Sequence, residues 1–233
     1  MAFGVWGIVV VGTSMGGLRA LETLAEGLPA GFPLPVAVVQ HRSPDSGDLL
    51  RMLLQRRSAL KVVEPNDKEA IVAGRIYLAP PDYHLIVDRG SFSLSVDPPV
   101  TYARPSVDVL FETAADAYGK EVIGVVLTGA NHDGSAGVSR IKAKGGFVVV
   151  QDPNSSESPV MPRSAIATSQ ADIILPMREI APFLAGLCSY LLPDDASGAP
   201  VRPSHPPAGS KRNAARHPLP GGESSPSSPG AGE

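Results

Sequence analysis

The sequence has few of the features that identify other classes of protein. It contains one cysteine, Cys188, which excludes an internal disulfide bond and is typical of a reducing compartment. No apolar run approaches the roughly 20 residues that a membrane-spanning helix needs. The N-terminus also lacks the charged region and cleavage site of a secretory signal. We therefore expect a cytoplasmic protein with no direct membrane insertion.

Charge and cofactor motifs are equally sparse. The formal net charge is −3 over 233 residues, which gives no reason to expect nucleic acid as a partner. The histidines are scattered, and neither a C-x-x-C nor an H-E-x-x-H motif is present, so no metal site is predicted. The G-x-G-x-x-G fingerprint and the lysine of a P-loop are both missing. We predict no cofactor.

The composition changes near Pro193. From Pro200 to Glu233 the chain consists largely of Pro, Ser, Gly and Ala, with almost no large apolar side chain. Such a segment cannot bury enough apolar surface to offset the entropy lost on ordering. We predict a catalytic domain over residues 1–192 and a disordered tail over 193–233.

The first 192 residues alternate between short apolar runs and amphipathic segments. Because the apolar runs lack polar alternation, they are typical of parallel strands covered on both faces by helices. The sequence therefore predicts a doubly wound α/β fold with a mostly parallel sheet. An antiparallel meander or hairpin is expected from Arg75–Ala79, His84–Asp88 and Ser91–Val96. The other expected strands are 5–11, 35–40, 61–64, 122–127, 147–151 and 173–175, and the expected helices are 17–27, 47–57, 107–118, 135–144, 162–168 and 180–192.

The segment Gly12-Thr13-Ser14-Met15-Gly16-Gly17 follows the first apolar run and precedes the first helix. A serine at such a turn is lifted off the sheet edge, beside the free amides of a helix N-terminus. The G-x-S-x-G spacing is that of a nucleophile elbow. Taken alone, it is also compatible with an ordinary strand-to-helix turn.

Two further predicted strands end in chemically useful residues. His41 follows the second strand, and Asp133 lies in the loop after the strand 122–127. Since the carboxyl ends of parallel strands share one edge of a sheet, Ser14, His41 and Asp133 are expected to meet there. A hydroxyl, an imidazole and a carboxylate are the groups needed for nucleophilic attack on a carbonyl. The order Ser…His…Asp differs from that of the α/β-hydrolases, and the serine follows the very first strand, so both features argue against that class.

Each residue also has a structural interpretation. Asp133 precedes Gly134 and could cap the following helix, and His41 could be a structural strand-end residue. His132 is a rival base, although a residue adjacent to its own carboxylate is poorly placed to bond it through the ring. His84, in the expected meander, is predicted to be structural.

Taken together, the loops resemble the catalytic domain of bacterial chemotaxis protein-glutamate methylesterases. The resemblance extends over residues 5–188 and rests on six ordered blocks. They are Val11-Gly12-Thr13-Ser14 with Gly16-Gly17, Val38-Val39-Gln40-His41, Ile76 to His84, Arg104-Pro105-Ser106-Val107-Asp108, Leu127-Thr128-Gly129 with Asp133-Gly134, and Gln151-Asp152 through Met161-Pro162.

The resemblance implies that Ser14, His41 and Asp133 form a catalytic triad. It implies hydrolysis of glutamate γ-methyl esters on chemoreceptors or related signalling proteins, with release of methanol, and deamidation of glutamine as a companion activity. Backbone amides near Met15, His41 or Ala130 would hold the oxyanion, and Arg104 would contact the substrate.

Two departures from the family pattern are evident. The loop before the aspartate usually reads Thr-Gly-Met-Gly-x-Asp-Gly, whereas here Ala130 and Asn131 replace the methionine and the second glycine. Family members usually carry an N-terminal receiver domain, but this chain begins almost at the first strand, so control by a separate receiver or kinase protein is expected.

Three alternative functions remain open from sequence. The first is a serine esterase or amidase with another substrate, and the second is a non-catalytic regulatory module of the same fold. The third is a nucleotide-binding α/β protein.

Overall fold

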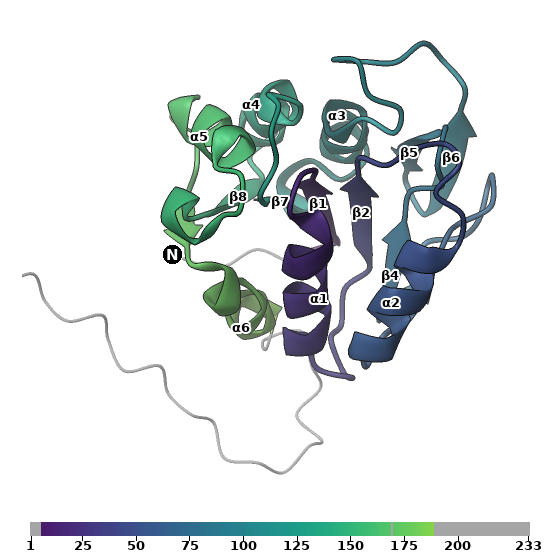
Figure 1. The fold of residues 1–233 in the computed structure, drawn as a ribbon, viewed down its shortest axis with the longest axis horizontal. Helices are drawn as coiled ribbons and strands as arrows, with labels where there is room; N and C mark the ends of the chain where they lie inside the picture. Colours follow the sequence, from purple (N-terminus) through teal and green to yellow (C-terminus); the bar gives the residue numbers. More distant parts are fainter. Residues whose placement is uncertain (1–5, 169, 189–233) are drawn as a thin grey trace, which may run out of the picture. The chain divides into compact units, whose positions relative to one another are not determined.

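The computed structural model describes residues 6–168 and 170–188 (Figure 1). These residues belong to one compact unit. The tail predicted for residues 193–233 lies outside the described residues. In the described part of the chain, no helix has the length and apolar character needed to cross a membrane.

A seven-stranded parallel sheet forms the centre of the fold. Its order is β3-β4-β2-β1-β7-β8-β9, and every neighbouring pair runs parallel. The central strands are almost fully buried, which explains why their sequences are rich in Val and Ile without polar alternation. The strands are β1 (Ile8–Thr13), β2 (Val36–Gln40), β3 (Lys61–Val63), β4 (Arg75–Leu78), β7 (Val122–Val126), β8 (Phe147–Gln151) and β9 (Ile173–Leu175).

Helices cover both faces of this sheet (Figure 1). One face packs against α1 (Gly17–Gly27), α2 (Leu49–Arg57) and α6 (Met177–Cys188). The other face packs against α3 (Val107–Tyr118), α4 (Ser135–Ala143), α5 (Val160–Ala167) and the antiparallel hairpin of β5 (His84–Asp88) and β6 (Ser91–Ser95). Two single turns of 3₁₀-helix, Gly119–Glu121 and Pro153–Ser155, complete the described elements. The predicted doubly wound α/β class is confirmed.

The predicted meander is wrong in one strand. Residues Arg75–Leu78 do not pair with the hairpin but form β4, which lies parallel between β2 and β3. Ile76, Tyr77 and Leu78 are all buried, so this run has the two-sided burial of an internal parallel strand. Among the strands of the described residues, β5 and β6 are the only antiparallel pair.

Two helices begin earlier than the sequence predicts. The helix expected to open at Pro162 starts at Val160, so the proline occupies its third position. A proline is tolerated there because the first N–H groups of a helix have no partner within the helix. The last helix starts at Met177 rather than Ile180, with Pro182 inside it. Its predicted end, residues 189–192, lies outside the described residues.

The strand order places a topological switch point at the middle of the sheet. From β1 the chain continues to β2 on one side, whereas β7 pairs with β1 on the other side. The carboxyl ends of β2, β1 and β7 are therefore neighbours. In open α/β sheets, ligands bind outside the carboxyl ends of strands at such a point.

Candidate active site

Ser14 lies on a tight turn between β1 and α1. Its backbone N–H donates to the Thr128 carbonyl at 3.0 Å, and its own carbonyl accepts from the Gly17 N–H at 3.0 Å. Gly16 has a φ of 77°, a left-handed conformation that glycine adopts without strain. β1 extends through Thr13, two residues further than predicted, so the turn begins directly at Ser14. Ser14 therefore lies on the tight strand-to-helix turn that the sequence predicts.

Gln40, at the end of β2, ties this turn to the next strand. Its Nε2 donates to the carbonyls of Ser14 at 2.8 Å and His41 at 2.9 Å. A Cβ at Gly17 would lie 1.8 Å from Gln40 Oε1, so this position has room only for glycine. Gln40 therefore fixes the relative placement of the two backbone segments that present the serine and the histidine.

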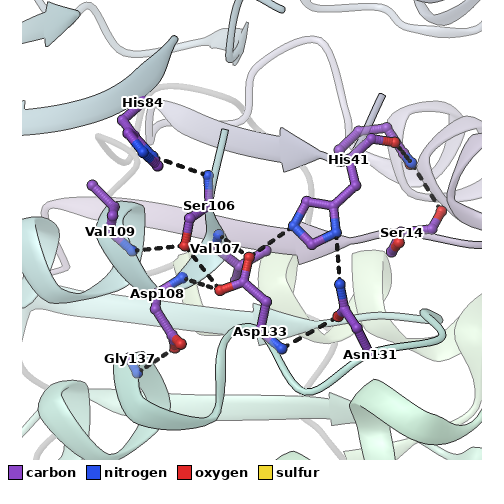
Figure 2. Close-up of polar contacts among 11 residues, drawn as sticks. Ser14, His41, His84, Ser106, Val107, Asp108, Val109, Asn131, Asp133 and Gly137 are labelled. Atoms are coloured by element: carbon purple, nitrogen blue, oxygen red, sulfur yellow. Dashed lines mark hydrogen bonds and ion pairs between the residues drawn. The ribbon is translucent and has the colours of Figure 1, made fainter. Parts of the chain in front are cut away.

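His41 and Asp133 form a hydrogen-bonded pair between the ends of β2 and β7. His41 Nε2 lies 2.7 Å from Asp133 Oδ2 (Figure 2). The Asp133 side chain is fully buried, whereas 14% of the His41 side chain is exposed. The aspartate can thus orient the ring while the ring remains accessible from solvent.

The N-terminus of α3 holds the Asp133 carboxylate. Oδ1 accepts from the Ser106 hydroxyl and the Asp108 N–H, both at 2.9 Å, and Oδ2 accepts from the Val107 N–H at 2.7 Å. Burial, the largest influence, raises the pKa of Asp133. The hydrogen bonds from His41, Asp108 and Val107 outweigh burial and hold the pKa below its usual value. The carboxylate is therefore ionised at neutral pH.

The structural alternatives for this loop do not hold. The cap of α4 is Gly134, with a φ of 102°, and the Asp133 side chain faces α3 and His41 instead. The rival base His132 is exposed, and its Nδ1 bonds the Ser164 hydroxyl of α5 at 2.6 Å. Asn131 and Asp133, on either side of His132 in the sequence, are the residues that contact the His41 ring.

Two more titratable residues lie behind the pair. Asp108 accepts from the Gly137 N–H at 2.8 Å; burial, and to a lesser extent the neighbouring charge of Asp133, raise its pKa to about 6. His84 is buried, with one ring nitrogen 3.2 Å from the Pro98 carbonyl and the other accepting from the Ser106 N–H at 3.3 Å. His84 thus supports the residue that bonds Asp133, in keeping with its predicted structural role.

Asn131 contacts the second nitrogen of the His41 ring. Its Nδ2 lies 3.0 Å from His41 Nδ1 (Figure 2). Because the ionised Asp133 can only accept, Nε2 bears the proton of the neutral ring, and Nδ1 has the lone pair that a general base uses. Figure 2 draws Ser14 on the side of the ring that bears Nδ1, and Asp133 on the side that bears Nε2.

The remaining predicted site residues differ in their placement. Met15 and Ala130, whose backbone amides were expected near the oxyanion, are exposed and follow Ser14 and Gly129 at the ends of β1 and β7. Arg104 instead bonds Asp82 Oδ1 at 2.6 Å and the carbonyls of Val96 and Asp97. These contacts join the loop before β5 to the loop after β6, so the Arg104 side chain holds two loops of the hairpin region together.

The sequence interpretation missed the contacts of three polar side chains. Gln40 was included as a strand residue and in a family block, Ser106 in a family block, and Asn131 as a departure from the family loop, none of them with a contact to the other site residues. For Ser106 a signal existed, because serine directly before a helical segment is a favoured N-cap whose helix amides attract a carboxylate. For Asn131, only the three-dimensional structure shows the ring contact.

A cavity of about 400 Å³ opens beside the triad candidates. It is lined by Ser14, Gly16, Gly17, Leu18, Arg19, Gln40, His41, Arg42, Leu50 and Glu157. Ser14 and His41 thus line one space that can admit a small group. In the described ranges, no group of three or more His, Cys, Asp or Glu side chains is arranged to hold a metal ion.

Comparisons with known proteins identify the family of this chain. The sequence matches the CheB methylesterase family over residues 9–184. The chain belongs to the CheB methylesterase family. The family prediction made from the six sequence blocks is confirmed.

Individual relatives agree with this membership. A Leptospira interrogans protein, named provisionally as a protein-glutamate methylesterase/protein-glutamine glutaminase, is 43% identical over 174 residues, which are 74% of this chain and 90% of that protein. A second protein of that name, from Anaeromyxobacter dehalogenans, is 42% identical over 74% of this chain and 51% of its own length. The crystal structure of the Thermotoga maritima CheB methylesterase catalytic domain superposes with a TM-score of 0.75 at 37% identity, covering 79% of this chain and all of that one.

Proposed function

We propose that this CheB family member is a serine hydrolase that removes methyl groups from glutamate γ-methyl esters of chemoreceptors. The observation that supports this most is the pairing of His41 with Asp133 at 2.7 Å, in a site whose cavity is lined by both Ser14 and His41. Relatives named protein-glutamate methylesterase supply the substrate class.

The first half of the proposed reaction forms an acyl-enzyme. Ser14 Oγ attacks the ester carbonyl carbon while His41 Nδ1 takes the hydroxyl proton. Asp133 stabilises the resulting imidazolium through the hydrogen bond at Nε2. Backbone amides of Met15 and Ala130 are the proposed donors to the oxyanion, each contributing about 3–4 kcal/mol to transition-state stabilisation.

The second half returns the enzyme to its starting state. The bond between the carbonyl carbon and the methoxy oxygen breaks, and methanol leaves with the proton held by His41. Water then attacks the acyl-serine, gives a proton to His41, and releases the glutamate side chain as Ser14 regains its hydrogen. Every proton passes through the same imidazole.

The surroundings of the cavity suit a glutamate-rich receptor segment. Arg19 lines the cavity and can attract an acidic residue of a substrate, whereas Arg42 is paired with Glu64 and Glu157 adds a negative charge to the lining. Met15 and Leu18 are 58% and 38% exposed, so apolar surface is available next to Ser14 for a protein substrate.

A second activity on the same site is glutamine deamidation. The relatives named above are also named protein-glutamine glutaminase. The same attack on a carboxamide would release ammonia instead of methanol. Control of either activity by a separate receiver or kinase protein stays a prediction.

Methanol release from methyl-esterified receptor tests the proposal directly. We expect wild-type protein to release methanol and Ser14→Ala to release none, with an unchanged thermal unfolding curve. Ser164→Ala serves as a matched control because Ser164 also bonds a histidine, His132, and should retain wild-type turnover. Turnover by Ser14→Ala at the wild-type rate would overturn the proposal.

A further inference from the structure

The lone pair of the His41 base is occupied by a side chain that the expected mechanism does not use. A neutral imidazole has one acceptor nitrogen with a single in-plane lone pair. In this structure that nitrogen is Nδ1, and Asn131 Nδ2 lies 3.0 Å from it. A serine hydroxyl that is to give its proton to Nδ1 must use the same lone pair.

The orientation of the Asn131 amide is fixed independently of the histidine. Its Oδ1 accepts from the Asp133 N–H at 3.2 Å, so the amino group is the end that faces His41. The histidine tautomer leads to the same assignment, because Nε2 donates to Asp133 Oδ2 at 2.7 Å and leaves Nδ1 as the acceptor. The Asn131 amino group is therefore the donor of this contact, and His41 Nδ1 is its acceptor.

We propose that the Asn131 side chain is a removable cap on the catalytic base. In the capped arrangement its amide donates to His41 Nδ1, and the ring is held in the correct tautomer but cannot accept the Ser14 proton. Rotation of the Asn131 side chain frees the lone pair. The fraction of protein with a free base then sets the rate of every reaction that begins with Ser14.

Proton transfer strengthens the argument that the cap must move. Once His41 has taken the serine proton, Nδ1–H is a donor and would face the donor Nδ2–H of Asn131. The capped position is therefore favourable with a neutral ring and unfavourable with the imidazolium. Asn131 thus acts through His41 as a positioning residue, and the inference rests on the proposed role of Ser14 and His41.

The rate at which a fluorophosphonate probe labels Ser14 measures the fraction of protein in which His41 Nδ1 is not capped by Asn131. Its reaction forms a bond from Ser14 Oγ to phosphorus and expels fluoride, while the hydroxyl proton passes to His41 and then to solvent. A neutral hydrogen bond of net worth 0.5–1.5 kcal/mol corresponds to an equilibrium factor of roughly two to ten. We expect the second-order labelling rate of Asn131→Ala to exceed that of wild type by about two- to tenfold.

Asn131→Ser separates the loss of the contact with His41 from any disturbance of the local turn. Its hydroxyl can still accept from the Asp133 N–H, yet it is too short to reach the ring, so the same acceleration is expected. His132→Ala is the matched control: this neighbour bonds Ser164 rather than His41, and its labelling rate should equal that of wild type.

Nitrogen-15 NMR of His41 provides a readout that a merely structural role would not move. Loss of the donor should shift the Nδ1 resonance toward that of an unbonded acceptor nitrogen in both Asn131 variants. Folded Asn131 variants that label at or below the wild-type rate would overturn the cap. Failure of wild-type protein to label at Ser14 would instead overturn the proposed function, so the two failures are distinguishable.

Discussion

Replacement of Asp133 by asparagine tests the proposed role of this carboxylate, because the two side chains have the same shape. Oδ1 accepts from Ser106 and the Asp108 N–H, and Oδ2 accepts from His41 and the Val107 N–H. All four partners donate. An asparagine must present its amino group to one of these two pairs, and each pair contains a backbone N–H that cannot turn away.

The consequence for activity follows from the tautomer. With the amino group in the Oδ2 position, His41 Nε2 must accept, so the ring proton moves to Nδ1 and no lone pair faces Ser14. We expect Asp133→Asn to lower the rate of methanol release by about 10³–10⁴-fold. Ser14 labelling by a fluorophosphonate should fall with it.

The consequence for stability has a defined pH dependence. One unsatisfied backbone N–H costs about 1–3 kcal/mol of unfolding free energy, offset in part because a neutral amide is buried more easily than a charge. Since the pKa of folded Asp133 is lowered, its contribution is present above the unfolded pKa of about 3.9 and is lost as the pH falls below it. The free energy of unfolding, measured with urea, should therefore differ more between wild type and Asp133→Asn at pH 7 than at pH 3. Activity within tenfold of wild type, or an equal difference at both pH values, would refute the reasoning.

Three further changes have defined outcomes. Ser106→Ala removes the 2.9 Å bond to Asp133 and the cap of α3, so urea unfolding should show a loss of about 1.5–3 kcal/mol. Gly17→Ala would place a Cβ 1.8 Å from Gln40 Oε1 and displace its amide, so Ser14 labelling should slow about 10- to 100-fold; an unchanged rate would show that Gln40 positions nothing. Burial raises the pKa of Asp108 to about 6. The stability that this carboxyl contributes when protonated is therefore fully present below its unfolded pKa and is lost as the pH rises through 6. Asp108→Asn should remove a decline of about 1–2 kcal/mol in unfolding free energy between pH 4 and pH 7, and a decline that persists in this variant would exclude Asp108 as its source.

The parts of the site that strand ends determine could be predicted from the sequence. Continuous Val and Ile runs located β1, β2 and β7, and parallel geometry then brings Ser14, His41 and Asp133 to one edge of the sheet. The fold class followed from the same runs. What failed was the partner of Arg75–Leu78, because a short apolar run shows burial on two faces but not which strand lies beside it.

The side-chain contacts around the site could not be predicted because they join residues that are distant in sequence. Ser106 reaches Asp133 across 27 positions, and Asn131 reaches His41 across 90. Each side chain has several possible rotamers, and only the packed α3 N-terminus and the loop after β7 select the ones observed. A glycine pattern such as Gly16-Gly17 predicts a tight turn, whereas the Gln40 side chain that fills the adjacent space is visible only in the structure.

Peptide-level mass spectrometry after reaction with a fluorophosphonate tests the central claim most directly. The account predicts one adduct, on Ser14, in wild-type protein and at least a thousandfold slower formation of that adduct in His41→Ala. An adduct on Ser164 or another serine, or labelling of Ser14 at the wild-type rate without His41, would contradict it.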